Sequence, residues 1–238
     1  MTNLVTCKIN QLDIQRPYKY MISTILLGTT NRKKIIEMRP LLEPMGYSLV
    51  DLSAMPDHKD VEETGNDFIE NARLKAITYA TRYRTWAIGE DSGLCVPVLG
   101  GAPGIYSARF ASLSRSIDST EVTKTVAKTI AMTQDEANNA LLLERLAGVA
   151  TDERAAYYVS TIVLASPEGE TVVEAAGECW GRIVSTARGV GGFGYDPLFE
   201  VVEYHKTFAE LGARVKSVLS HRGRALAKFL RLLRTLND

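Results

Sequence analysis

Residues 86–110 have the sequence WAIGEDSGLCVPVLGGAPGIYSARF, and they decide the fold that we expect for this chain. The apolar start is typical of a buried strand, and Ser92-Gly93 predicts a turn directly after Glu90 and Asp91. Two carboxylates at the end of a strand lie where open α/β sheets place their chemistry. Their oxygens suit Mg²⁺, which takes one or two protein carboxylates and leaves its other positions to water and phosphate. Alone, such a pair is more often a solvated acidic turn, so the rest of the chain has to support a metal site.

Length and charge set the class of protein. The 238 residues are 45% hydrophobic, enough to bury a full core as one large domain or as two lobes that share a sheet. Lysine plus arginine equals aspartate plus glutamate, at 28 each, so the chain has no general basic field for a nucleic-acid polymer. Any anion site must therefore come from a local concentration of charge.

Cysteine usage and hydropathy indicate the compartment. Cys7, Cys95 and Cys179 are odd in number and widely spaced, which argues against a disulfide framework or a zinc site. No apolar run approaches the ~20 residues of a membrane span, and the chain does not start with a signal pattern. We expect a soluble, cytoplasmic protein without a membrane partner. Residues 1–20 show no periodicity and are interpreted as an arm before the domain.

A phosphate site is predicted near the start of the domain. Residues 22–27 resemble a buried strand, and 33–42 have apolar positions at helical spacing. The polar turn between them consists of Gly28, Thr29, Thr30 and Asn31. Backbone N–H groups and hydroxyls at a helix N-terminus can cradle phosphate, with Lys34 one turn into the helix to supply charge. Helix capping alone explains the same residues about equally well.

A second helix, predicted over about 67–83, carries Asn71 and Lys75 four residues apart beside its apolar stripe. A buried helix would direct both side chains toward the same neighbour. Glu63, just before this helix, is a second candidate Mg²⁺ ligand if the fold brings it against Asp91. The alternative is a solvated helix face. The other elements that we expect are a strand over 47–52, a Ser/Thr-rich segment over 111–118, helices over 119–132 and 135–147, and an antiparallel hairpin of 155–165 and 171–184.

A glycine-rich loop at 189–197, GVGGFGYDP, follows the hairpin. It matches G-x-G-x-x-G formally, but Asp196-Pro197 stands where a dinucleotide-binding helix should begin, so we reject that interpretation. Phe193 and Tyr195 are predicted to stack on a base, and Asp196 to accept from its N–H groups. Ser220 is a good N-cap for a final helix, which places His221 and Arg222 at a helix N-terminus.

These motifs together identify a family. They are Thr29-Thr30-Asn31 with Lys34 and Glu37, Glu62 to Gly65, Phe68 to Ala72 with Lys75, Asp91 to Leu94, Gly100 to Phe110, Gly191 to Phe199, and Ser220 to Gly223. In this order and over about residues 22–236, the sequence resembles the non-standard purine nucleoside triphosphate pyrophosphatases, also called inosine triphosphate or dITP/XTP pyrophosphatases. The resemblance implies an α/β fold with a mixed sheet, formed by residues 21–238 as one two-lobed domain with the active-site cleft between the lobes.

The resemblance also implies the activity: a Mg²⁺-dependent, generally homodimeric enzyme that directs water at the α-phosphorus of ITP, dITP or XTP. The products are a nucleoside monophosphate and pyrophosphate, so the enzyme cleanses the nucleotide pool. Asp91 is then the metal-binding general base, and Glu63, alone or with Glu62, is a metal ligand. The triphosphate is held by Thr29, Thr30, Asn31, Lys34 and Lys75. The base is recognised by Phe193, Gly194, Tyr195, Asp196, Lys216, His221 and Arg222, with Ser92 close to the substrate.

Base selectivity should depend on the 6-oxo group of the purine. Hydrogen-bond donors such as Lys216, His221 and Arg222 would be left unpaired against the 6-amino group of adenine, a penalty of ~1–3 kcal/mol per buried polar group. The chain departs from the family at three places. Glu90 stands where many members have a second aspartate, residues 111–134 form an insertion, and the arm at 1–20 is additional.

Two other functions are compatible with the sequence. One is a pyrophosphatase for methylated or pyrimidine triphosphates, and the other is a nucleotide-binding regulator without catalysis, in which the insertion serves a partner. Glu63, Lys75 and Asp91 argue against the regulator, because a pure binder needs no pairing of metal ligand and base. A serine hydrolase is disfavoured by the lack of a G-x-S-x-G motif.

Overall fold

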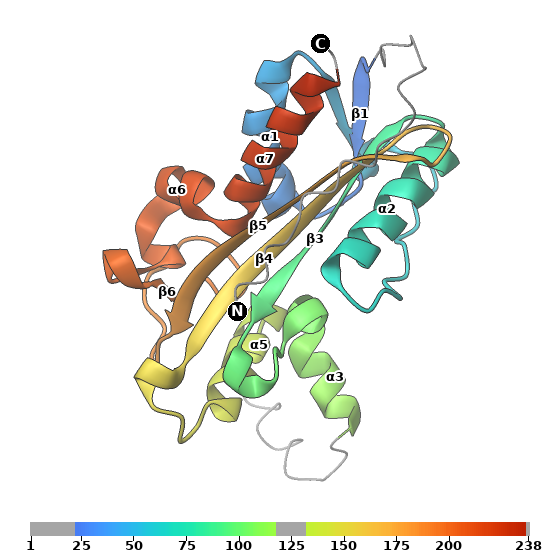
Figure 1. Cartoon of the computed structure of the whole chain (residues 1–238). Coiled ribbons are helices and arrows are strands. Elements are labelled where there is room, and N and C mark those ends of the chain that lie inside the picture. The colour runs from blue at the N-terminus through green and yellow to red at the C-terminus, as the bar shows by residue number, and fades with distance from the viewer. Residues whose placement is uncertain (1–21, 118–131, 237–238) are drawn as a thin grey trace. The chain divides into compact units, whose positions relative to one another are not determined.

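The computed structural model describes residues 22–117 and 132–236. The predicted arm at 1–20 and nearly all of the helix predicted over 119–132 lie outside these residues. The strands are β1 (Thr24–Leu27), β2 (Ser48–Asp51), β3 (Trp86–Cys95), β4 (Ala155–Ala165), β5 (Thr171–Ile183), β6 (Phe199–Val201) and β7 (Lys206–Thr207). The helices are α1 (Arg32–Leu42), α2 (Phe68–Tyr83), α3 (Phe110–Ile117), α5 (Gln134–Arg145), α6 (Phe208–Leu219) and α7 (His221–Thr235) (Figure 1).

The strands form one mixed sheet with the order β2-β1-β3-β4-β5-β6-β7. β1 pairs in parallel with β2 and β3, whereas β6 is antiparallel to both β5 and β7. The predicted hairpin is present as the neighbouring strands β4 and β5, which are joined by the short connection 166–170. The mixed sheet with its helices confirms the predicted α/β class.

The chain forms two compact units. Unit 1 comprises the described residues up to 92 together with 159–178 and 219–236, and unit 2 comprises 93–117, 132–158 and 179–218. In unit 1, α1 and α7 lie on one face of β1 and β3, and α2 lies on the other (Figure 1). Alternation along β1 serves both faces: Ile25 and Leu27 pack with Phe229 of α7, while Leu26 packs with Ala76 of α2.

Gly89 explains how closely α2 approaches the sheet. A Cβ atom at this position would lie 2.1 Å from the carbonyl oxygen of Ala72 and 2.5 Å from the backbone nitrogen of Ala76. Because backbone atoms cannot move aside as a flexible side chain can, only glycine permits this contact. The contact brings the helix that carries Asn71 and Lys75 directly against β3.

The turn predicted at Ser92-Gly93 is wrong, because β3 continues through both residues to Cys95. β3 lies between β1 and β4 in the sheet, and backbone pairing along the strand outweighs the weak turn preference of a Ser-Gly pair. The chain reverses later, where Val96 N–H donates to the carbonyl oxygen of Ala102 (3.1 Å).

Unit 2 contains its own core, in which Leu94, Leu142, Tyr158, Phe199 and Phe208 are buried together. The segment over 111–118, for which no helix was predicted, belongs largely to α3. The Asn138 side chain of α5 ties the start of this helix down: it accepts from Ala111 N–H (2.9 Å) and donates to the carbonyl oxygens of Ser107 and Ala108 (3.2 and 3.1 Å).

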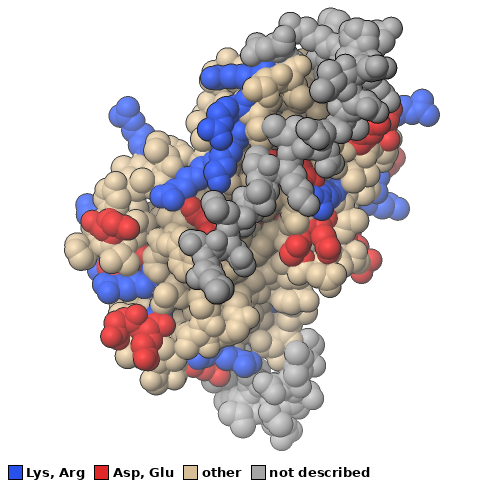
Figure 2. All heavy atoms as spheres, in the orientation of Figure 1, with Lys and Arg blue, Asp and Glu red and all other residues tan. Residues whose placement is uncertain are grey.

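The surface and the hydropathy agree with the balanced composition. Basic and acidic side chains both occur on the face shown in Figure 2, and neither sign covers it. No helix within 22–117 or 132–236 is both long and apolar enough to cross a membrane. Cys95 and Cys179 are buried, as expected for small apolar residues.

Candidate active site

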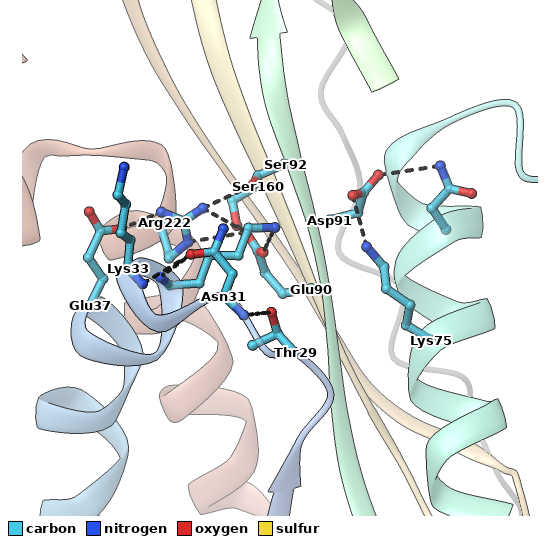
Figure 3. A network of polar contacts seen from close by, with 12 residues as sticks. Thr29, Asn31, Lys33, Glu37, Lys75, Glu90, Asp91, Ser92, Ser160 and Arg222 are labelled. Carbon is cyan, nitrogen blue, oxygen red and sulfur yellow. Dashed lines mark hydrogen bonds and ion pairs between the residues drawn. The ribbon is translucent and has the colours of Figure 1, made fainter. Parts of the chain in front are cut away.

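The two adjacent carboxylates of β3 point in opposite directions. Successive side chains of a strand face opposite sides of the sheet, so Glu90 and Asp91 reach different neighbours although both are buried. Figure 3 shows Asp91 directed toward Lys75 of α2, and Glu90 on the side of Arg222. The acidic pair therefore forms two separate groups of contacts in unit 1.

The Asp91 group contains a shared ammonium. Lys75 Nζ donates to Asp91 Oδ1 (3.0 Å) and to Glu63 Oε1 (2.8 Å), and Asn71 Nδ2 donates to Asp91 Oδ2 (3.4 Å). Burial lowers the pKa of Lys75, but the charges of Asp91 and Glu63 outweigh it, so the pKa is raised and the ammonium is retained. Burial raises the pKa of Asp91 above its ordinary value, although the Lys75 and Lys34 charges oppose this.

The predicted convergence of Glu63 on Asp91 is thus present, with Lys75 between the two acids. Glu62 is exposed, so the structure brings Glu63 and not Glu62 to this group. In the described part of the chain, no group of three or more histidine, cysteine, aspartate or glutamate side chains is placed to hold a metal ion by itself. Any metal here would have to complete its coordination with groups from water or substrate.

The Glu90 group is a buried network of ion pairs. Glu90 Oε2 lies 2.7 Å from Lys34 Nζ of α1, and Glu90 Oε1 accepts from Arg222 Nε (3.2 Å) and from Ser160 Oγ (2.8 Å). Burial alone would raise the pKa of Glu90, but the charges of Arg222 and Lys34 hold it well below its ordinary value. Glu90 therefore stays ionised and fixes the position of Lys34.

Arg222 occupies the centre of this network. Its guanidinium also donates to Glu37 of α1 and to Ser92 Oγ (2.9 Å), and its side chain is 2% exposed. The burial reflects its position in the first turn of α7, packed against the sheet. The role predicted for Arg222 in base recognition stays a prediction, because the contacts seen here link α1, β3 and α7.

Ser160 and Glu37 were not among the predicted site residues. Ser160 and its neighbour Thr161 are small polar residues inside the largely apolar strand β4, a pattern that is equally typical of a buried strand without function. Glu37 belongs to the sequence motif of α1 but has no local feature that indicates its partner. Both become recognisable only through their contacts with Glu90 and Arg222.

The polar turn before α1 is a helix cap. Asn31 Oδ1 accepts from the backbone N–H groups of Lys33 (3.0 Å) and Lys34 (3.4 Å), and Thr29 Oγ1 accepts from Asn31 N–H (3.1 Å). Capping is therefore confirmed. Phosphate binding by Thr29, Thr30 and Asn31 stays a prediction, and the exposed position of Thr30 and Asn31 is compatible with it.

His221 and Ser220 open α7 as predicted, with Ser220 Oγ accepting from Gly223 N–H (3.2 Å). His221 is buried rather than on the surface, because α7 begins tightly packed on β5. A Cβ atom at Gly177 of β5 would lie 2.3 Å from the His221 carbonyl oxygen. The contact of the His221 side chain with a base stays a prediction.

The glycine-rich loop belongs to unit 2 and is closed by Asp196. Its Oδ2 atom accepts from Phe193 N–H (2.8 Å) and from Lys216 Nζ of α6 (2.6 Å). The same ammonium lies 4.6 Å from the centre of the Phe193 ring. Gly192 is required here, because a Cβ atom at this position would lie 1.9 Å from Asp196 Oδ2. The structure thus brings together Phe193, Asp196 and Lys216, three of the residues that were predicted to recognise the base.

Tyr195 does not have the predicted stacking position. Its ring is 3% exposed within the unit 2 core, and its hydroxyl donates to the carbonyl oxygen of Ser107 (2.9 Å). Burial raises the pKa of Tyr195, so the hydroxyl keeps its proton. Tyr195 therefore anchors the loop, and the half-buried Phe193 is the ring left to contact a base.

Comparisons with known proteins agree on one family. A model of the Ham1 family matches residues 25–232. The dITP/XTP pyrophosphatase of Desulforamulus reducens is 42% identical over 212 residues, which cover 89% of this chain and 96% of the relative. The dITP/XTP pyrophosphatase of Rhodopirellula baltica is 42% identical over 215 residues, covering 90% and 95%.

Solved structures lead to the same result. The Staphylococcus aureus Ham1 protein superposes with a TM-score of 0.73 at 33% identity, covering 90% of this chain and 99% of that one. A HAM1 protein from Coxiella burnetii has a TM-score of 0.74 at 32% identity, covering 90% and 100%. Because the family model spans most of the sequence and the relatives align over nearly their full length, this chain belongs to the Ham1 family.

Proposed function

We propose that this protein is a pyrophosphatase of non-standard purine nucleoside triphosphates, which converts dITP, XTP and ITP to the monophosphate and pyrophosphate and so cleanses the nucleotide pool. Family membership and the names of the relatives support this function. One observation of the structure carries it furthest: two buried or half-buried carboxylates, Asp91 and Glu63, converge on the single ammonium of Lys75.

Asp91 is suited to act as the general base. Its Oδ1 atom is held by Lys75 and its Oδ2 atom by Asn71, so the carboxylate has one orientation in which to accept a proton from the attacking water. Lys75 can also bind a phosphate oxygen when the substrate arrives, because its ammonium has three donors and Asp91 and Glu63 are two acceptors. Lys34, oriented by Glu90, supplies a second cation for the triphosphate.

The donor set fits Mg²⁺. Asp91 Oδ1 and Glu63 Oε1 already face one cation, the ammonium of Lys75, at 3.0 and 2.8 Å. Two carboxylates are the usual protein contribution to a magnesium site that also takes water and phosphate oxygens. When bound, the ion neutralises negative charge on the triphosphate, which phosphoryl chemistry requires. Asp91 and Glu63 would hold it.

Recognition of the base is assigned to Phe193, with its neighbours Gly194 and Asp196, and to Lys216. The Phe193 ring offers a face for stacking, and the Lys216 ammonium beside it is a donor suited to a 6-oxo group. His221 and Arg222 are proposed as further hydrogen-bond donors to the base.

The test is pyrophosphate release from ITP, XTP, dITP, GTP, ATP and CTP, with Mg²⁺ and with a chelator. We expect rapid release from ITP, XTP and dITP only, abolished by the chelator. Comparable release from CTP would indicate the broader pyrophosphatase. No release from any of them would favour the non-catalytic regulator.

We also propose a cytoplasmic homodimer, on the basis of the family resemblance. Light scattering coupled to size-exclusion chromatography gives the mass in solution, and a mass near twice 26.2 kDa is expected. A monomeric mass at micromolar concentration would contradict the dimer.

A further inference from the structure

The loop that carries Phe193 is attached to α5 through Gly194. Asp135 Oδ2 accepts from Gly194 N–H (3.0 Å), and Asn139 Nδ2 donates to the Gly194 carbonyl oxygen (3.1 Å). Asp135 and Asn139 are four residues apart, so they lie one above the other on a single face of α5. Asp135 and Asn139 thus satisfy both backbone polar groups of Gly194. The N–H group of Gly194 belongs to the peptide bond that joins Gly194 to Phe193, so the Asp135 contact lies directly beside Phe193.

The helix is a firm support for these contacts. A capping box between Thr133 and Glu136 closes its N-terminus, and Leu142 is fully buried in the unit 2 core. Asn138, between the two loop contacts, donates to the carbonyl oxygen of Ser107, which also accepts from the Tyr195 hydroxyl. Helix α5 and the end of the loop are therefore both bonded to the carbonyl oxygen of Ser107.

The loop needs such support because of its composition. Gly191, Gly192 and Gly194 surround Phe193, and Gly192 and Gly194 adopt positive φ angles of 75° and 60°. Glycine has the largest backbone freedom of all residues, so a segment of this kind does not hold one conformation by itself. The hydrogen bonds from α5, together with those of Asp196, select the conformation that presents the Phe193 ring.

We propose that Asp135 and Asn139 are positioning residues that fix Phe193 for stacking on the purine, and so govern affinity for the base end of the substrate. This inference rests on the proposed function. Both residues belong to unit 2, and neither is assigned a part in the chemistry. They should therefore act on substrate binding and leave the hydrolytic step unchanged.

The experiment compares Asp135→Ala and Asn139→Ala with the wild type, using the full chain. Each variant should raise KM for dITP about five- to tenfold, as expected for one lost hydrogen bond, with kcat changed less than about twofold. Asp135→Asn keeps an acceptor oxygen and should restore most of the affinity. Glu144→Ala removes an exposed carboxylate from the same helix, away from the loop, and should have the wild-type KM.

Two inhibitors separate the base end from the phosphate end. Inosine 5′-monophosphate should bind the Ala variants more weakly by the same factor as dITP, whereas inorganic tripolyphosphate, which has no base, should bind unchanged. A merely structural defect would weaken both ligands or lower kcat. Equal weakening of both ligands, or an unchanged KM, would overturn the proposal.

A double-mutant cycle keeps the test decisive if a variant is unstable. In a Phe193→Ala background, Asn139→Leu, which removes the donor at similar size without adding a charge, should have no further effect on KM, since the ring that Asn139 positions is absent. Additive effects would refute the positioning role. If the wild type hydrolyses none of the triphosphates, the proposed function itself fails; if the wild type is active and these variants match it, only this inference fails.

Discussion

Glu90 and Asp91 are consecutive residues of β3, yet their carboxylates pair with different lysines: Glu90 Oε2 lies 2.7 Å from Lys34 Nζ, and Asp91 Oδ1 lies 3.0 Å from Lys75 Nζ. Glu90 belongs to a network that joins α1, β3 and α7, whereas Asp91 faces α2 and Glu63. We therefore expect separable roles, a structural one for Glu90 and the proposed chemical one for Asp91, and substitutions should distinguish them.

Asp91→Asn should remove catalysis and preserve the fold. The amide cannot accept the proton of the attacking water, so at saturating Mg²⁺ we expect kcat to fall by about 10²- to 10⁴-fold. The affinity for a non-hydrolysable dITP analogue should stay within a few-fold. Steady-state kinetics and calorimetric titration give the two quantities. Glu62→Gln, at an exposed neighbour of Glu63, is the control, and a near-normal kcat for Asp91→Asn would contradict its assigned role.

Glu90→Gln should mainly reduce stability. It leaves the buried Arg222 guanidinium with one carboxylate partner fewer and releases Lys34, and removing one member of a buried ion pair costs about 3–5 kcal/mol. Denaturant unfolding measures the loss. Glu43→Gln breaks the surface pair with Arg39 and should cost less than about 1 kcal/mol. Similar losses for both variants would show that the Glu90 network does not stabilise the fold.

Gly89→Ala should separate α2 from β3. The new Cβ atom would lie 2.1 Å from the Ala72 carbonyl oxygen, so the helix has to move, at a cost of about 1–3 kcal/mol. Because α2 carries Lys75, the shift should also lower kcat. Gly46→Ala is the control: its Cβ meets nothing within 4 Å, and only the left-handed backbone angle is penalised, by about 1 kcal/mol. Full activity in a destabilised Gly89→Ala protein would show that Lys75 does not depend on this contact.

Glu200 should make the stability of the protein depend on pH. It is buried and bonded to Arg182 (2.5 Å) and Arg188 (2.7 Å); burial alone would raise its pKa, but the two arginines lower it below the ordinary value. A lowered pKa in the folded state stabilises the protein above the unfolded-state pKa of about 4.3, and the stabilisation is lost as the pH falls through the folded-state pKa.

Glu200→Gln should accordingly cost about 1–2 kcal/mol at pH 7, a modest value because both arginines are partly exposed. The difference from the wild type should shrink as the pH falls below about 4. Thermal unfolding as a function of pH measures it. Glu203→Gln, at an exposed position, should match the wild type throughout. A difference that persists unchanged at low pH would show that the charge of Glu200 is not its source.

Local patterns predicted most of the fold. The strand, polar turn and helix over 22–42, the helix over 67–83, the hairpin of 155–165 and 171–184 and the final helix all appear within a few residues of their expected bounds. Each rests on apolar periodicity, caps and turn residues, which act between neighbours in the chain. The errors lie where residues close in the sequence have little influence on the backbone conformation. Ser92-Gly93 is extended as part of the long strand β3, and α3 is helical where its start is tied to Asn138.

The sequence by itself determined the family, the order of the elements and the residue types of the site, because these depend on motif identity and on interactions a few residues apart. Only the tertiary structure decided which charges meet. Arg222 pairs with Glu90 across 132 positions, and Lys75 bridges Asp91 and Glu63. It also assigned Tyr195 to the core rather than to the base. Such contacts depend on how buried faces pack and on which polar groups must be satisfied out of water, and sequence spacing contains neither.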